Sequence, residues 1–145
     1  MKPFGTLLET SGTVIDTWSQ FANAEAIDIL GARGFDFTII DTEHGAFGLE
    51  TAEGLVRACD AAGLVPIVRI PANEGRMITK ALDIGAAAVQ IPKISSVKET
   101  EQAVLASRYA PEGTRGACPC VRAGVIWRAT DAGLPTRHAH RASSR

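Results

Sequence analysis

The feature of this chain that most constrains its fold is a repeated alternation of strand-like apolar runs with helical patterns. The strand-like runs occupy residues 13–17, 36–40, 64–70 and 86–91. Helical patterns fill the intervals, most clearly where Leu55, Ala58, Cys59 and Ala62 fall at positions i, i+3, i+4 and i+7. Such alternation is typical of βαβ units and predicts a parallel sheet covered by helices.

Local signals at the ends of the expected helices support the same order of elements. Gly34, Gly63 and Gly85 each stand between a helical pattern and the next strand-like run, where a left-handed residue costs glycine little. Ser96 and Glu99 have the spacing of a capping box, which predicts the start of a further helix. The units therefore use the same helix-to-strand connection three times.

Units of this size can close into a (β/α)8 barrel or wind over both faces of an open sheet. An open sheet usually shows a glycine-rich phosphate loop after its first strand, but residues 17–21 contain no glycine. The sequence therefore favours an α/β fold of the TIM-barrel type. Because a complete barrel needs about 250 residues, we expect residues 1–127 to hold only its first four β/α units.

The last residues, 128–145, differ in character from the rest of the chain. They contain no apolar run, and their four arginines outnumber the single acid, Asp131. Without interleaved aromatic residues, this basic tail is expected to be disordered or read out of frame, and not to bind nucleic acid. His138 and His140 make a weak metal-ligand pair because no expected element fixes their geometry.

Composition narrows the class of partner. The formal net charge is -1 and apolar residues make up 46% of the chain, which allows a core but gives no attraction to nucleic acid or an anionic membrane. No 18 apolar residues run together, so we expect a cytoplasmic protein, and its charge leaves small neutral or anionic partners open. The spacing Cys118-Pro119-Cys120 lacks the two intervening residues of a redox or zinc motif, and we expect a packed loop there.

Residues with catalytic chemistry follow the expected strands. The segment Asp41-Thr42-Glu43-His44-Gly45 comes directly after the second run, Arg69 ends the third, and Gln90 ends the fourth. Because the carboxyl ends of parallel strands meet at one mouth of a barrel, these side chains should converge. A carboxylate beside an imidazole can set up a base, and a rim arginine can bind a substrate carboxylate through two N–H groups.

Each of these residues also has a purely structural interpretation. Asp and His are common in turns, so the segment 41–45 alone fits a turn as well as it fits a site. Arg69 alone could extend from a strand end to water. Asp83 lies near the carboxyl end of an expected helix, where the dipole disfavours an acid. It is either a surface acid or a residue held for a partner.

Four segments together indicate a family. They read FDFTIIDTEHG (35–45), VRIP (68–71), LDIGA (82–86) and YAPEGTRG (109–116). In order and spacing they resemble the 4-hydroxy-2-oxo-heptanedioate aldolase family of metal-dependent class II aldolases, which is related to the citrate lyase beta chain. The resemblance covers about residues 10–127. It implies a TIM barrel, usually a homo-hexamer, that cleaves a 4-hydroxy-2-oxo acid into pyruvate and an aldehyde in aromatic compound catabolism.

The resemblance also implies roles for single residues. By position, His44 is the catalytic base and Asp41 is the acid that orients it. Arg69 matches the arginine that binds the pyruvate carboxylate, and Asp83 resembles an acid that reaches the His-Asp pair of a neighbouring subunit. Carbon–carbon cleavage leaves an enolate whose charge needs a cation, while the 4-hydroxyl must lose a proton near neutral pH, which suits imidazole.

The metal site of the family has no counterpart in this sequence. Its divalent ion, Mg²⁺ or Mn²⁺, is bound by a Glu at the end of the fifth strand and an Asp after the sixth, beyond the resemblance. The sequence therefore offers no metal ligands. Two alternatives to an active aldolase stay open: a catalytically inactive truncated remnant, because the pattern stops near Trp127, and a lyase that acts on CoA thioesters.

Overall fold

The computed structural model describes residues 4–10 and 12–124. In chain order its elements are α1 (Phe4–Thr10), β1 (Asp16–Ser19), α2 (Ala24–Ala32), β2 (Phe37–Asp41), α3 (Leu49–Ala62), β3 (Val65–Arg69), α4 (Gly75–Asp83), β4 (Ala88–Gln90) and α5 (Val97–Ser107). Within this described part, no helix is both long and apolar enough to cross a membrane. The expectations for residues 128–145 lie outside the described residues.

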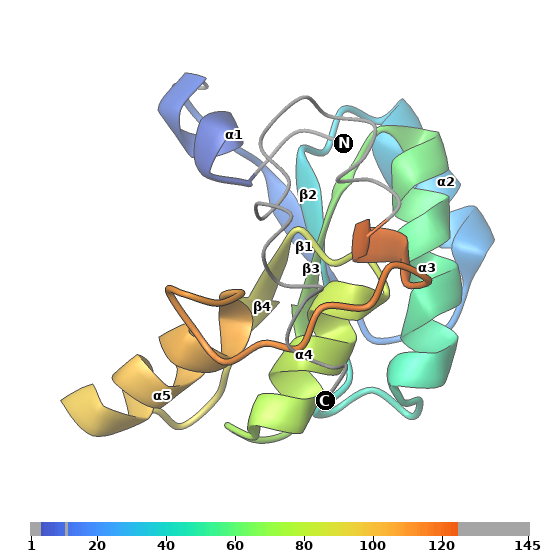
Figure 1. Cartoon of the computed structure of the whole chain (residues 1–145). Helices are drawn as coiled ribbons and strands as arrows, with labels where there is room; N and C mark the ends of the chain where they lie inside the picture. The colour runs from blue at the N-terminus through green and yellow to red at the C-terminus, as the bar shows by residue number, and fades with distance from the viewer. Residues whose placement is uncertain (1–3, 11, 125–145) are drawn as a thin grey trace.

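The four strands form one parallel sheet in the order β1-β2-β3-β4, so each strand pairs with the next one along the chain. A helix connects each strand to the next and packs beside the sheet (Figure 1). The prediction of an α/β fold with four β/α units is confirmed. The strand order is that of consecutive strands in a TIM barrel, and the described residues form an arc of such a barrel.

The two faces of the sheet carry different side chains, because neighbouring residues of a strand point to opposite sides. On one face, Ile40 of β2 and Val68 of β3 are fully buried in a core with Ile78 of α4. Each such side chain contributes about 1.5–3 kcal/mol by leaving water. Asp41 and Arg69 directly follow Ile40 and Val68, so they belong to the opposite face, which is the interior side of a barrel.

The predicted helix ends are confirmed. Gly63 ends α3 with a φ of 76°, in the left-handed region, and Gly34 and Gly85 also have positive φ values. At the start of α5, the Ser96 hydroxyl accepts the backbone N–H of Glu99 at 3.3 Å, and the Glu99 carboxylate accepts that of Ser96 at 3.0 Å. This is the capping box that the sequence predicted, and it fixes where the fourth β/α unit turns into its helix.

The amino-terminal elements differ from the prediction. The first strand was expected at residues 13–17, but β1 spans Asp16–Ser19, because its ladder begins where Asp16 pairs with Phe37. Its far end is polar and is held through side chains, with the Ser19 and Thr38 hydroxyl oxygens 2.8 Å apart, so no apolar run marks it. Helix α1 was not predicted; its Phe4 packs edge-on against Phe37 with 5.2 Å between ring centroids.

After α5 the chain runs back across α4 towards α3 (Figure 1). Arg115 Nη2 donates to Asp83 Oδ1 at 2.7 Å, and Arg122 is ion-paired with Asp60. Asp83 and Asp60 lie at or near the carboxyl ends of α4 and α3, which are the helix ends next to the starts of β4 and β3. The returning segment is therefore fastened at the amino ends of the strands, opposite to the expected mouth.

Candidate active site at the carboxyl ends of the strands

The segment after β2 forms a tight turn that is fixed to two strands. The Gly45 N–H donates to the Asp41 carbonyl at 3.2 Å, and both the N–H and the hydroxyl of Thr42 donate to the Arg69 carbonyl, at 2.9 and 2.6 Å. A Cβ on Gly45 would collide with the backbone carbonyl oxygen of Asp41 and would lie 2.9 Å from the Phe47 ring, so the turn needs glycine at this position. The side chains that follow β2 are thus presented from a rigid support.

Asp41, the last residue of β2, is fully buried and accepts five hydrogen bonds. Its Oδ1 accepts Arg69 Nε at 2.9 Å and the backbone N–H groups of Glu43 and His44 at 3.0 and 3.1 Å. Its Oδ2 accepts Arg69 Nη2 at 2.5 Å and Gln20 Nε2 at 2.8 Å. The carboxylate therefore joins the ends of three neighbouring strands.

These hydrogen bonds decide the protonation of Asp41. Burial by itself would raise the pKa of this carboxyl, but the hydrogen bonds from Arg69 and Gln20, with those from two backbone amides, outweigh burial and hold the pKa well below its ordinary value. Asp41 is therefore a fixed anion near neutral pH. It can orient and balance charge, but it does not exchange protons there.

Arg69 lies beside Asp41 because the two residues are register partners in β2 and β3. Its side chain is 16% exposed, and its guanidinium lies 4.4 Å from the centroid of the Trp18 ring. The hydrogen bond to Asp41 raises the pKa of Arg69. Nη1 takes part in none of the hydrogen bonds among the described residues, so one edge of the guanidinium keeps its donors for a carboxylate.

Glu43 lies close to three basic side chains at the mouth: Arg69, Lys93 and His44. Its side chain is 9% exposed, and its oxygens lie 3.5 Å from Arg69 Nε, 3.6 Å from Lys93 Nζ and 3.9 Å from His44 Nε2. The last distance is too long for a hydrogen bond, and the His44 side chain is 63% exposed. Asp41, which was expected to orient the imidazole, contacts His44 through its backbone N–H. Glu43 is the carboxylate beside the ring.

The other two residues singled out from the sequence lie apart. Gln90 ends β4 and is the register partner of Arg69, so it belongs to the same mouth. Asp83 ends α4 at the opposite end of the sheet, where it binds Arg115. Within this chain, Asp83 is thus separated from Asp41 and His44 by the length of the strands.

Three residues of the mouth were not predicted. Gln20 directly follows β1, and the strand-end rule that found Asp41 would have found it if β1 had been placed correctly. Trp18 lies on the interior face of β1, but its stacking partner Arg69 is two strands further along the chain and therefore leaves no local pattern. Lys93 adopts a φ of 57° after β4, and no neighbouring residue signals that conformation.

The described residues do not fit a resident metal ion. No group of three or more His, Cys, Asp or Glu side chains in residues 4–10 and 12–124 could hold one. Asp41 and Glu43 are the acids of the mouth, and both are already engaged with Arg69. The three cysteines are free thiols, Cys59 buried and Cys118 and Cys120 exposed. Burial raises the pKa of Cys59 to about 12.

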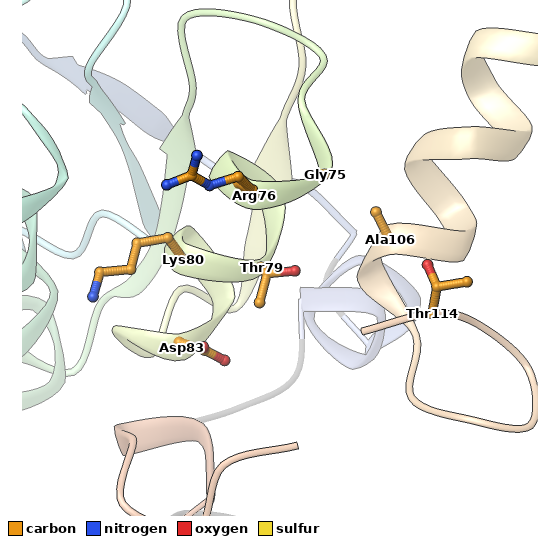
Figure 2. A pocket seen from close by; sticks show the side chains of 7 residues that line it. All are labelled: Gly75, Arg76, Thr79, Lys80, Asp83, Ala106 and Thr114. Atoms are coloured by element: carbon orange, nitrogen blue, oxygen red, sulfur yellow. The ribbon is translucent and has the colours of Figure 1, made fainter. Parts of the chain in front are cut away.

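A hollow of about 330 Å³ lies between α4 and α5 (Figure 2). It is lined by Gly75, Arg76, Thr79, Lys80, Asp83, Ala106 and Thr114. The side chains of Arg76 and Lys80 extend away from Ala106 and Thr114 (Figure 2). Its charged groups therefore do not converge on one point, in contrast to those of the mouth.

Comparison with known proteins identifies the family. A family model described as HpcH/HpaI aldolase/citrate lyase matches residues 15–136. The chain belongs to the HpcH/HpaI aldolase/citrate lyase family. The match includes every element from β1 to α5 and continues past Trp127, where the resemblance seen in the sequence ends.

Named HpcH/HpaI relatives fit this assignment. The chain is 34% identical over 128 residues to the 5-keto-4-deoxy-D-glucarate aldolase of Escherichia coli O139:H28, covering 88% of this chain and 50% of that protein. The solved citrate synthase SbnG is 36% identical with a TM-score of 0.76, covering 81% of this chain and 48% of SbnG. The HpcH/HpaI aldolase of Desulfitobacterium hafniense DCB-2 is 29% identical with a TM-score of 0.74, covering 79% and 45%. The chain thus spans about half the length of the relatives it matches.

Proposed function

We propose that this chain supplies the substrate-binding and proton-transferring half of a divalent-metal-dependent aldolase, which cleaves 4-hydroxy-2-oxo acids into pyruvate and an aldehyde. The observation that carries the proposal is the Asp41–Arg69 pair at the mouth, with donors of Arg69 left over and His44 beside it. Membership of a family that includes a named aldolase supports it.

Each residue has a task that its surroundings allow. Arg69 binds the carboxylate of the 2-oxo acid through Nη1 and balances the charge of the enolate that cleavage leaves. His44 removes the proton of the 4-hydroxyl, since its exposed ring is held by no hydrogen bond of the described residues and can turn to the substrate. Asp41 fixes Arg69 and the backbone of the turn.

The metal and the assembly belong to the proposed whole enzyme. A divalent ion would stabilise the enolate, and we propose that its ligands lie outside the described residues. The assembly would be a homo-oligomer, with Asp83 reaching a neighbouring subunit as in the resembled aldolases. In this chain Asp83 is bound to Arg115, so that role requires the pair to open or to be shared.

The test is pyruvate release by the purified chain from a 4-hydroxy-2-oxo acid with added Mg²⁺ or Mn²⁺, paired with a direct titration of pyruvate binding. Release that falls about 100-fold or more in His44→Ala, but not in the matched surface variant Lys80→Gln, supports the aldolase. Absence of both release and binding in the wild type refutes the proposal.

An inactive remnant is the second candidate. One observation favours it: the described residues hold no group of side chains that could bind a metal ion. The same pair of experiments separates the candidates. A remnant binds pyruvate through Arg69 but releases none from the substrate, with or without metal.

A further inference from the structure

Lys93 is the least expected residue of the mouth. It follows β4 by three positions and has a φ of 57°, the only positive φ of a non-glycine residue among the described residues. Residues other than glycine rarely adopt this backbone conformation, because their Cβ atom comes too close to the following carbonyl oxygen. Strained residues of this kind cluster at ligand-binding sites, where the surrounding structure maintains them.

The conformation places the Lys93 ammonium against the centre of the site. Lys93 Nζ lies 3.6 Å from Glu43 Oε1, while Arg69 Nε lies 3.5 Å from Glu43 Oε2. Arg69 and Lys93 therefore flank one carboxylate, so that two cationic groups lie close together at the mouth. The Lys93 side chain is 84% exposed, so its two remaining N–H groups are accessible to an incoming anion.

The charge balance points the same way. Asp41 and Glu43 contribute two negative charges to the mouth, and Arg69 and Lys93 contribute two positive charges. Without Lys93 the cluster would carry a net negative charge, which opposes an anionic substrate. Arg69 already gives two donors to Asp41, so it offers one edge to one carboxylate and has no second edge for another.

We propose that Lys93 binds a second carboxylate of the substrate, so that the site selects 2-oxo acids with two carboxylates over those with one. This inference rests on the proposed function, because Arg69 must hold the first carboxylate. Glu43 keeps Lys93 at the mouth until the substrate arrives. Lys93 is then a specificity residue on the β4–α5 connection, which none of the motifs in the sequence marked.

The experiment titrates the full chain with pyruvate and with 2-oxoglutarate and compares the two dissociation constants. Wild type is expected to bind 2-oxoglutarate about tenfold more tightly than pyruvate, as one charge-assisted contact allows. Lys93→Gln should abolish this preference and leave pyruvate binding unchanged, and Lys93→Arg should retain it. Lys93→Gly, which keeps the left-handed backbone without strain, should behave like Lys93→Gln. Lys80→Gln is the matched control at the other end of the sheet.

The outcomes separate the two proposals. Equal affinity of the wild type for both acids, or an unchanged preference in Lys93→Gln, overturns the role of Lys93 while the proposed function stands. A loss of preference in Lys93→Gln that Lys93→Gly does not share attributes the effect to the backbone and overturns it as well. A wild type that binds neither acid overturns both proposals.

Discussion

Two aspartate–arginine pairs lie at opposite ends of this sheet and use the same chemistry. At the carboxyl ends of the strands, Asp41 binds Arg69; at the amino ends, Asp83 binds Arg115. Each guanidinium also lies over an aromatic ring, 4.4 and 4.5 Å from its centroid. The number of hydrogen bonds within each pair and the surroundings of the pairs differ. Asp41 accepts five hydrogen bonds, and two further charged side chains, Glu43 and Lys93, meet there.

The difference teaches that an acid–arginine pair does not by itself mark a site. The Asp83–Arg115 pair holds the segment that follows α5 against α4, and this contact is a structural one. The pair with Arg69 leaves one edge of the guanidinium to a ligand and brings a histidine, a second acid and a lysine to the same place. Convergence of unlike groups at the carboxyl ends of strands is what indicates function.

The largest expected effect is on folding stability. Asp41→Ala removes a fully buried carboxylate that accepts five hydrogen bonds, two of them from Arg69, so we expect a loss of about 3–5 kcal/mol in the free energy of unfolding. Asp83→Ala removes one hydrogen bond and should cost about 1–3 kcal/mol. Urea denaturation of both variants measures the difference. Equal losses would mean that the two pairs are equivalent.

The next effect is on ligand binding. Arg69→Lys removes the two-pronged contact with Asp41 and the free Nη1 edge together, so pyruvate should bind about tenfold more weakly. Arg115→Lys, the same substitution at the other end, should leave pyruvate affinity unchanged. Isothermal titration calorimetry distinguishes the two. A loss of affinity in Arg115→Lys would place the ligand at the wrong end of the sheet.

The third expected effect is on the pH dependence of folding stability. Because the pKa of Asp41 in the folded chain lies below its ordinary value of 3.8, its stabilising contribution is complete above about pH 5 and is lost as the pH falls below 4. The urea midpoint of the wild type should therefore fall steeply in acid, and that of Asp41→Asn should fall less. Parallel pH profiles of the two proteins would contradict the depressed pKa.

The smallest expected effect is on the free energy of unfolding when the left-handed residue at each end of the sheet is replaced. Lys93 has a φ of 57° at the mouth, and Gly63 has a φ of 76° at the amino ends. Lys93→Gly should raise the free energy of unfolding by about 1 kcal/mol, and Gly63→Ala should lower it by a similar amount. Thermal melts of the two variants should shift in opposite directions. A destabilised Lys93→Gly would mean that its backbone is not strained.

Much of the fold could be predicted because its signals are local. The glycines at helix ends and the Ser96–Glu99 capping box act within a few residues of themselves, and all are observed. Strand β1 was misplaced because Ser19 is held by Thr38, which lies in another strand. Helix α1 was missed because it packs through single contacts, such as Phe4 on Phe37, rather than through a periodic stripe.

The sequence predicted where the site lies, but it did not predict most of the contacts within it. The topology of parallel strands is enough to bring Asp41 and Arg69 to one mouth. The direction of each side chain depends on register and on partners far along the chain. Hence the contact between Glu43 and Lys93, which lie on the connections after two different strands, has no sequence signal.

The central claim, that ligand binds at the carboxyl ends of the strands, is tested most directly by mapping pyruvate onto the backbone amides of the chain by two-dimensional NMR. The account predicts that the shifts concentrate at residues 41–45, at Arg69 and at residues 90–93, and that Asp83 and Arg115 stay unchanged. Shifts confined to Asp83, Arg115 and their neighbours, or no shifts at all at millimolar pyruvate, would contradict it.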